Sequence, residues 1–336
     1  MIGKTLIAGL INIMLVAAGP GPIEKPPVLR GAKETFAVSP SHWEDRLLLY
    51  SLKHEVEGET ASYVPGPLVS LSKIGQAWRV REIKPVAADI DSGSIVWAKG
   101  NAYVTSSRGI YRLRPNGVAE KIYSGQPRGL AVSRDGTTLA FWLSPQKLDV
   151  LTVLRISDRR VLKRWPLPFK VQTESSGWQL AFAPDGGSIL ARTYDEETGP
   201  DLKVFDLRTG SMTTLLRDCV SIVQSGDGIF VLGEQDETRD LYRFSGGKLE
   251  LLTHINNRVD SLTPTALSSV VVAGFAFKKY LWVYDAEKHS AQEVNGCTDA
   301  TVLKSGQHLF FLDGKVFLDP AACPPVPPAQ PEETDR

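Results

Sequence analysis

The sequence predicts an all-β protein, a single β-propeller of about seven four-stranded blades that follows an N-terminal signal peptide. Pairs of short apolar strands joined by Asp-Gly turns recur roughly every 40–50 residues, which is the spacing of propeller blades. Another apolar strand follows each pair at a steady offset. The 29 glycines and 22 prolines are scattered along the chain, as expected where turns are frequent. Six or eight blades are compatible with the same pattern.

The first 18 residues have the pattern of a signal peptide. One positive charge lies within residues 1–4, and the segment from Thr5 to Ala18 is apolar except for Thr5 and Asn12. This segment is too short for a comfortable membrane span and ends in small residues suited to cleavage. Residues 19–31 form a Pro/Gly linker. We therefore expect an exported protein, periplasmic or extracellular, with an uncleaved membrane anchor as the alternative.

The clearest internal repeat relates residues 129–141 to residues 179–191. Each copy is an apolar strand, a turn and a second apolar strand, with Ser-Arg-Asp-Gly at 133–136 and Ala-Pro-Asp-Gly at 183–186. Asp-Gly suits such a turn because glycine adopts positive φ without steric cost and aspartate tolerates unusual backbone angles. Weaker copies follow at 221–232 and 301–312, and residues 89–98, with a turn at Ser92-Gly93, resemble an earlier one.

The strand that follows each pair has alternating apolar residues and ends in a turn. It is clearest at 202–210, with relatives at 110–117, 241–247 and 281–285. This alternation is typical of a strand with one buried face. Together the two motifs resemble the WD40-like repeats of TolB-type β-propellers over roughly residues 86–320. Ser133-Arg134 departs from that pattern at the proline, and the last repeat lacks the aspartate. The resemblance implies a fold and leaves the function open.

We place the propeller at residues 32–320 and a disordered, proline-rich tail at 321–336. The final blade is one strand short, and Thr35 to Val38 is a candidate for the missing strand, which would close the ring by pairing the chain ends. Closure matters because an open ring leaves unpaired sheet edges. The blades are assigned to residues 34–83, 86–123, 126–166, 175–216, 219–253, 256–294 and 297–320.

No linear motif in the sequence indicates catalysis. It contains no Gly-x-Ser-x-Gly elbow, no His-Glu-x-x-His and no phosphate-binding Gly-rich loop, and its five histidines are dispersed. We therefore predict no catalytic residues, no metal site and no cofactor. The formal net charge is zero and the isoelectric point is about 7.0, which does not favour nucleic acid as a partner.

The loops between second and third strands are the best candidates for a binding surface. In a propeller they share one face with the connections between blades, and several of them are acidic. Basic or aromatic residues begin three of the innermost strands on the same face. The alternative is that none of these residues binds a partner: the acidic loops would then be ordinary solvated turns, and the basic and aromatic residues would serve packing or surface roles. The candidate binding residues are Glu55, Glu57, Arg128, Trp178, Asp195, Glu196, Glu234, Asp236 and Arg258.

The chain has three cysteines, and export would permit disulfides. Cys297 and Cys323 bracket the final repeat, so a bridge between them would hold the end of the chain in place. Cys219 is then left over as a thiol. The alternative is that all three are free and packed as small apolar side chains.

These features favour an exported, non-catalytic scaffold that binds a protein or a peptide. We expect a monomer, in contact with a membrane only if the N-terminal segment is retained. One alternative is a propeller enzyme of the lyase, lactonase or glycosidase type, whose site would assemble from separate blades in the central funnel. The other is a membrane-anchored sensor or assembly subunit.

Overall fold

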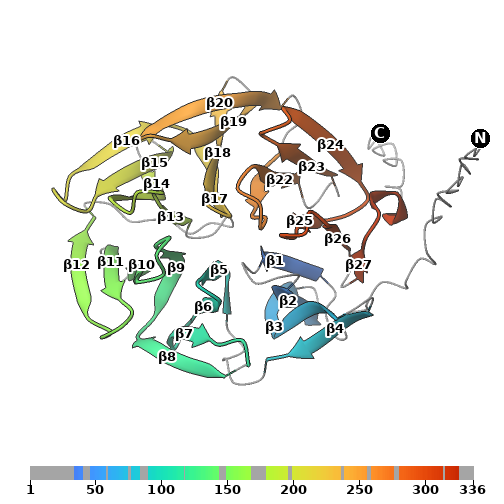
Figure 1. The fold of residues 1–336 in the computed structure, drawn as a ribbon, viewed down its shortest axis with the longest axis horizontal. Coiled ribbons are helices and arrows are strands. Elements are labelled where there is room, and N and C mark those ends of the chain that lie inside the picture. Colours follow the sequence, from blue (N-terminus) through green and yellow to red (C-terminus); the bar gives the residue numbers. More distant parts are fainter. Residues whose placement is uncertain are drawn as a thin grey trace, which may run out of the picture.

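In the computed structural model, β-sheets are arranged radially around a central axis, as in a propeller (Figure 1). Six of the sheets have four strands and one has three. The structure describes residues 34–40, 46–57, 60–74, 77–83, 90–116, 118–143, 149–167, 179–195, 199–235, 238–255, 259–275, 280–312 and 315–324. The predicted signal peptide and linker lie outside these ranges.

Each sheet is a meander of antiparallel strands in chain order, from the axis outwards. The first three blades comprise β1 (Glu34–Pro40), β2 (Arg46–Glu57), β3 (Thr60–Ile74), β4 (Ala77–Glu82); β5 (Ile90–Ala98), β6 (Asn101–Ser106), β7 (Gly109–Leu113), β8 (Ala119–Ser124); and β9 (Pro127–Val132), β10 (Thr138–Leu143), β11 (Val150–Arg155), β12 (Val161–Pro166).

The remaining sheets continue the ring in the same order. They comprise β13 (Leu180–Phe182), β14 (Ser188–Asp195), β15 (Gly199–Asp206), β16 (Met212–Leu216); β17 (Cys219–Ser225), β18 (Gly228–Gln235), β19 (Thr238–Ser245), β20 (Lys248–Ile255); β21 (Ser261–Thr263), β22 (Val270–Phe275), β23 (Tyr280–Asp285), β24 (Ser290–Asn295); and β25 (Asp299–Val302), β26 (His308–Leu312), β27 (Lys315–Phe317). These bounds follow the blades expected from the repeats.

The repeated turns connect the first two strands of the blades. In β9–β10 and β13–β14, Gly136 and Gly186 adopt positive φ values of 67° and 69°, as the Asp-Gly pattern predicts. The expected turn at Ser92-Gly93 is wrong, because residues 90–98 form the single strand β5. The chain turns instead at Lys99 and Gly100, whose φ values of 45° and 74° suit a tight hairpin.

The ring does not close through the strand expected from the sequence. Residues 34–40 pair with β2 and form the innermost strand of the first blade, so they do not supply a fourth strand to the last sheet. The first and last sheets meet instead through side chains: Leu47 and Leu71 pack with Leu309 and Phe311, all fully buried. Apolar packing between neighbouring sheets therefore closes the ring.

The hydrophobic core lies between the blades. Clusters of buried side chains occupy each junction, because alternate residues of a strand face opposite neighbours. Trp142, which is fully buried, packs edge-on against Phe205 of the next blade with ring centroids 6.2 Å apart. Trp97 and Trp282, on the strands β5 and β23, are also buried.

The described chain extends slightly beyond the predicted propeller. Residues Pro320–Ala322 form a short 3-10 helix, and Cys323 is buried against the last sheet. The rest of the predicted tail, residues 325–336, lies outside the described ranges. No helix in the described part of the chain is long and apolar enough to span a membrane.

Candidate functional site

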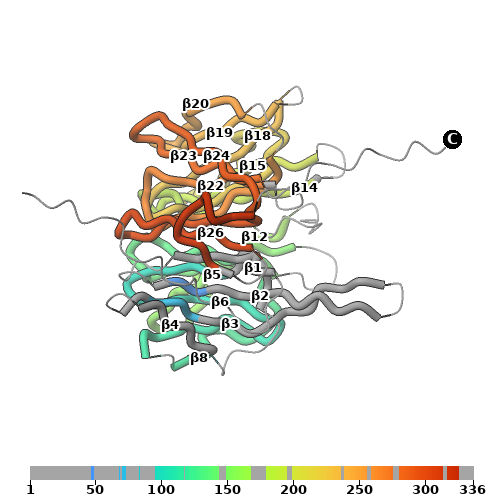
Figure 2. Tube along the Cα trace, turned by 90° about the vertical axis from the view of Figure 1, so that its right-hand side faces the viewer, coloured from blue at the N-terminus to red at the C-terminus, as the bar shows by residue number. Residues whose placement is uncertain are grey.

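The strands run between two faces of the disc, which is seen from its side in Figure 2. One face, called the loop face here, carries the loops between second and third strands and the connections between blades. The opposite turn face carries the turns between first and second strands and those between third and fourth strands. This assignment follows from the antiparallel order of each sheet.

The candidate binding residues were expected on the loop face, and the structure describes only some of them. Arg128 lies near the start of β9 and Glu234 near the end of β18; both are exposed. They are separated by the intervening blade β13–β16. The backbones of Glu55 and Glu57 lie in β2, and that of Asp195 ends β14. Outside the described residues lie Trp178, Glu196, Asp236 and Arg258.

Glu234 and several other ionisable side chains of the blade β17–β20 make paired contacts. The Glu234 carboxylate pairs with the buried Arg239, whose Nε donates to the carbonyl of Val259 at 3.0 Å. The neighbouring Asp240, also buried, accepts a hydrogen bond of 3.0 Å from the Tyr242 hydroxyl. Burial and this contact with Asp240 raise the pKa of Tyr242 to about 12. The ion pair with Arg239 therefore gives Glu234 a structural role in the blade β17–β20.

The exposed His254 of the outer strand β20 pairs with the same Asp240. Its Nδ1 lies 2.7 Å from the buried carboxylate of Asp240, and its side chain is 64% exposed. A carboxylate behind an exposed imidazole fixes the ring's orientation. Among the described residues, however, no three His, Cys, Asp or Glu side chains gather as a metal site would require.

Polar side chains link the innermost strands around the axis. The Gln179 amide donates to Ser221 Oγ at 3.1 Å, joining the blades β13–β16 and β17–β20. The Ser221 hydroxyl in turn accepts from the Leu262 N–H at 3.2 Å, and the Ser225 hydroxyl accepts from the Thr265 N–H at 3.0 Å. These bonds hold the inner strands in register because each satisfies a buried polar group of a neighbouring blade.

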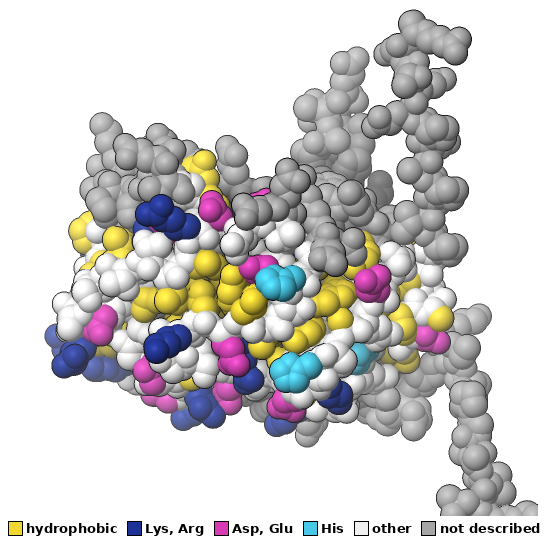
Figure 3. Space-filling view, turned by 90° about the horizontal axis from the view of Figure 1, so that it is seen from above, with side chains coloured by type: hydrophobic (Ala, Val, Ile, Leu, Met, Phe, Trp, Pro, Cys, Tyr) yellow, Lys and Arg dark blue, Asp and Glu magenta, His cyan; other side chains and the backbone are white. Residues whose placement is uncertain are grey.

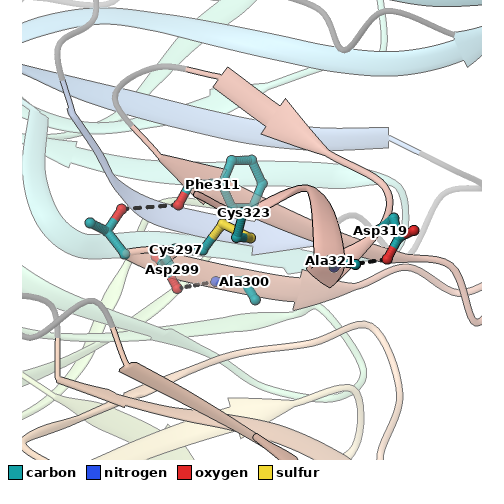
Figure 4. Close-up of a disulfide and its surroundings, with 8 residues drawn as sticks. Cys297, Asp299, Ala300, Phe311, Asp319, Ala321 and Cys323 are labelled. Atoms are coloured by element: carbon teal, nitrogen blue, oxygen red, sulfur yellow. Dashed lines mark hydrogen bonds between the residues drawn. A yellow bond between two sulfur atoms is a disulfide. The ribbon is translucent and has the colours of Figure 1, made fainter. Parts of the chain in front are cut away.

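Asp299 occupies the last junction of this series, beside the disulfide shown in Figure 4. Its Oδ1 accepts hydrogen bonds of 2.8 Å from Thr263 Oγ1 and from the Ala300 N–H. The side chain is nevertheless almost inaccessible, and burial raises its pKa from the usual 3.8 to about 7. A raised pKa can mark a functional site, but here the carboxyl faces a neighbouring strand, so we assign it a structural role.

The Asp299→Asn variant should remove a pH-dependent part of the protein's stability. The unfolded chain ionises this group near pH 4 and the folded chain near pH 7, so wild-type stability falls as pH rises between these values. Urea unfolding at pH 5 and pH 8 should show a loss of roughly 1–3 kcal/mol for the wild type that is absent from the variant. An equal pH dependence in both proteins would refute this role.

A pocket of about 800 Å³ lies on the turn face between the blades β9–β12 and β13–β16. Phe182 and Val153, both buried, lie beneath it, and Trp165 of the outer strand β12 forms part of its wall. Leu162, 40% exposed, adds apolar surface. The Asp-Gly turns of both blades form the rest of the rim.

Charged groups surround this apolar interior. Lys163 Nζ lies 5.2 Å from the centre of the Trp165 ring and donates to the Leu207 carbonyl at 2.6 Å. Asp135 accepts from Ser133 Oγ at 2.6 Å and from Thr137 Oγ1 at 2.7 Å, and these contacts lower its pKa. An apolar interior with a small number of oriented polar groups is the usual composition of a ligand pocket.

The outer wall on the other side of the ring also exposes apolar surface. Figure 3, a view onto the side of β16, β20 and β24, shows apolar side chains in a band between charged ones. On these strands Leu251 is 45% exposed and Met212 is 36% exposed. Partly exposed apolar side chains are common on protein surfaces, so we assign no binding site to this band.

Sequence reasoning directed attention to the loop face and missed the pocket. Trp165 lies on the outer strand β12, and from the sequence the Asp-Gly turns were interpreted only as markers of the repeats. The pocket is lined mostly by residues 133–138 and 162–165 of the blade β9–β12 and by residues 182–186 of the blade β13–β16. These segments meet because their blades are consecutive repeats. The signal in the sequence was therefore an Asp-Gly turn in each of two consecutive repeats, together with a tryptophan on the outer strand of the first.

The two sulfur atoms of Cys297 and Cys323 are joined in a disulfide, with Cα atoms 5.5 Å apart (Figure 4). Cys219 remains a free thiol, fully buried between the blades β13–β16 and β17–β20. Burial raises the pKa of this thiol to about 12, so it stays protonated and unreactive.

No family model and no curated protein sequence matches the chain. Among solved structures, the chain is similar to the β-propeller domain of Cps50 (Swd1) from Myceliophteria thermophila, with a TM-score of 0.58, 13% identity and coverage of 86% of this chain and 97% of that one. Sqt1 from Chaetomium thermophilum, bound to the N-terminus of the ribosomal protein L10, gives 0.54, 11%, 88% and 99%.

TolB from Acinetobacter baumannii is also similar, with a TM-score of 0.49, 14% identity and coverage of 76% of this chain and 77% of that one. Identities this low establish the fold alone. The chain has the β-propeller fold, as the repeats predicted.

Proposed function

We propose that this chain is an exported, non-catalytic propeller that binds another protein or a peptide, acting as a monomeric scaffold. The observation that carries the proposal is the pocket between the blades β9–β12 and β13–β16. Its size, about 800 Å³, and its apolar interior suit several side chains of a partner segment. Trp165 at its wall is the residue type that most often contributes strongly to protein interfaces.

The rigidity of the surrounding scaffold supports the same function. Apolar clusters fill the junctions on both sides of the pocket's blades, and hydrogen bonds link inner strands elsewhere around the axis. A pocket held by such a frame loses little conformational freedom when a partner binds. The similar propeller Sqt1 is bound to the N-terminus of a protein, which shows that this fold accommodates such a ligand.

Export is the second part of the proposal and is supported by the sequence of residues 1–18. The Cys297–Cys323 disulfide is consistent with it, because structural disulfides persist chiefly in oxidising compartments. Cleavage after Ala18 would release the propeller from the membrane.

The Trp165→Ala variant should weaken capture of the natural partner about tenfold or more, since tryptophan is a common interface hot spot. The wild type and variants are immobilised and incubated with the exported fraction of the native cells, and the recovered protein is quantified. Leu162→Ser, which changes an exposed residue of the same pocket, should also reduce recovery even if Trp165→Ala disturbs folding.

Leu251→Ser provides the matched control, because Leu251 is 45% exposed on the distant outer strand β20. Recovery by this control should equal that of the wild type. Equal recovery by the wild type and both pocket variants would exclude the pocket as the binding site.

A further inference from the structure

The charge of this nominally neutral chain is unevenly distributed. Residues 90–166, the blades β5–β8 and β9–β12, carry thirteen Lys and Arg against five Asp and Glu, a net charge of +8. The rest of the chain carries twenty-five against thirty-three, a net charge of −8. The zero total therefore conceals a basic sector on two adjacent blades.

Three guanidinium groups of this sector converge on one carboxylate at the junction of the two blades. Glu120 Oε2 lies 2.5 Å from Arg112 Nη2 and 3.0 Å from Arg114 Nη2. Glu120 Oε1 lies 2.6 Å from Arg159 Nη2, which comes from the next blade. We call these three arginines the arginine cluster. It lies at the turn face, because Arg114 follows β7 and Arg159 lies in the turn between β11 and β12.

The arginine cluster retains positive charge after this pairing. One carboxylate neutralises one of the three guanidiniums, and the hydrogen bonds from Arg112 and Arg114 lower the pKa of Glu120 to about 2, so it is ionised at neutral pH. Arg114 and Arg159 have side chains 51% and 52% exposed. Arg160, exposed beside Arg159, adds a further positive charge. Their outward N–H groups are accessible to an external anion.

We propose that the arginine cluster, together with Arg160, docks an acidic segment of the partner protein through that segment's carboxylates. The proposal rests on the proposed function and specifies the partner's chemistry. The arginine cluster already holds a carboxylate through both of its oxygens, so the guanidinium spacing fits this group. The pocket borders the same blade β9–β12 on its other side, also at the turn face.

The geometry favours an acidic protein segment over nucleic acid or an anionic membrane. The guanidiniums gather around one point at a blade junction, whereas phosphate backbones are usually followed by an extended groove with aromatic side chains for stacking. A membrane-bound surface generally combines basic residues with an amphipathic helix, and the only helix among the described residues is the 3-10 helix near residue 321. A carboxylate-rich peptide is therefore the expected ligand.

Fluorescence anisotropy with a labelled decaglutamate peptide tests this docking surface on the full propeller. The wild type should bind the peptide with an affinity that falls steeply as salt rises, and should not bind decalysine. Arg114→Glu/Arg159→Glu should weaken binding about tenfold, because both exposed positive charges are reversed. Arg114→Lys/Arg159→Lys should retain part of the affinity, since lysine keeps the charge and loses the planar fork.

Arg208→Glu/Arg217→Glu provides the matched control, because both arginines are exposed on the blade β13–β16 side of the ring. It should change the affinity less than twofold. Thermal unfolding confirms that each variant folds, and Arg114→Glu alone replaces the double variant if that one does not.

Three results would overturn the docking surface: no decaglutamate binding at low salt, an equal loss in the control, or cluster-dependent binding only to single-stranded DNA or to phosphatidylglycerol vesicles. The peptide is a defined probe of the arginine cluster, whereas the capture experiment tests the pocket. Failure of the peptide to bind is therefore distinguishable from failure of the pocket to recover a natural partner.

Discussion

Replacing both Cys297 and Cys323 by serine is expected to lower the free energy of unfolding by about 3 kcal/mol. The bridge closes a loop with a sequence separation of 26 residues, and a cross-link of that length restricts the unfolded chain by roughly this amount. Both sulfur atoms are buried in the cluster that joins the last two sheets. Losing the bridge therefore loosens the last three-stranded sheet, at which the ring closes.

Guanidinium chloride unfolding of the wild type, with and without reductant, measures this effect. The reductant should lower the midpoint of the wild type and leave that of the double serine variant unchanged. Gly296 shows how tightly the chain end is held: a Cβ there would overlap the carbonyl oxygen of Pro324. An unchanged midpoint for the serine variant would mean that packing alone holds the end of the chain.

The Trp142→Ala variant should lose about 3–5 kcal/mol of stability, the largest effect of any single substitution considered. Trp142 is fully buried between the blades β9–β12 and β13–β16, where it packs against Phe205 and Leu151. Truncation leaves a cavity at a junction that the two blades cannot close without shifting relative to one another.

Urea unfolding of Trp142→Ala and of Met212→Ala distinguishes the effect of burial on stability from the effect of shortening a large side chain. Met212 is 36% exposed on the neighbouring outer strand β16, so its truncation should cost less than about 0.5 kcal/mol. A loss for Trp142→Ala below about 1 kcal/mol would contradict the close packing of this junction.

The sequence predicted the blades well because repeated local patterns determine them. Each blade is an antiparallel meander whose strands alternate in polarity and whose turns contain Asp-Gly or similar pairs, so residues close in sequence are also paired in space. The turn at Lys99-Gly100 was missed because lysine rarely adopts positive φ, which made Ser92-Gly93 look more suitable.

Contacts between blades were harder to predict. Arg159 and Glu120 are 39 positions apart and meet only because their blades are neighbours. The inner-strand link from Gln179 to Ser221 spans 42 positions. Alternating polarity shows which residues leave a strand on the same side, but it does not show which side chains of adjacent blades lie opposite one another. The pocket and the arginine cluster therefore required the structure.

The closure of the ring illustrates the same limit. An unpaired sheet edge is a liability, which made residues 35–38 attractive as a strand for the last sheet. In the structure this strand pairs with β2 as the innermost strand of the first blade. The ring closes through packing of Leu47 and Leu71 against Leu309 and Phe311. The missing fourth strand in the final repeat therefore did not show how the first and last sheets of the ring would meet.

Native mass spectrometry of the protein purified from the exported fraction of its own cells tests the central claim most directly. We expect a mature chain that lacks residues 1–18 and carries a second protein or peptide bound to it. A full-length chain would show that residues 1–18 remain as an anchor. A mature chain that carries only a metal or a small molecule would contradict the binding scaffold and direct attention to an enzymatic site in the central funnel.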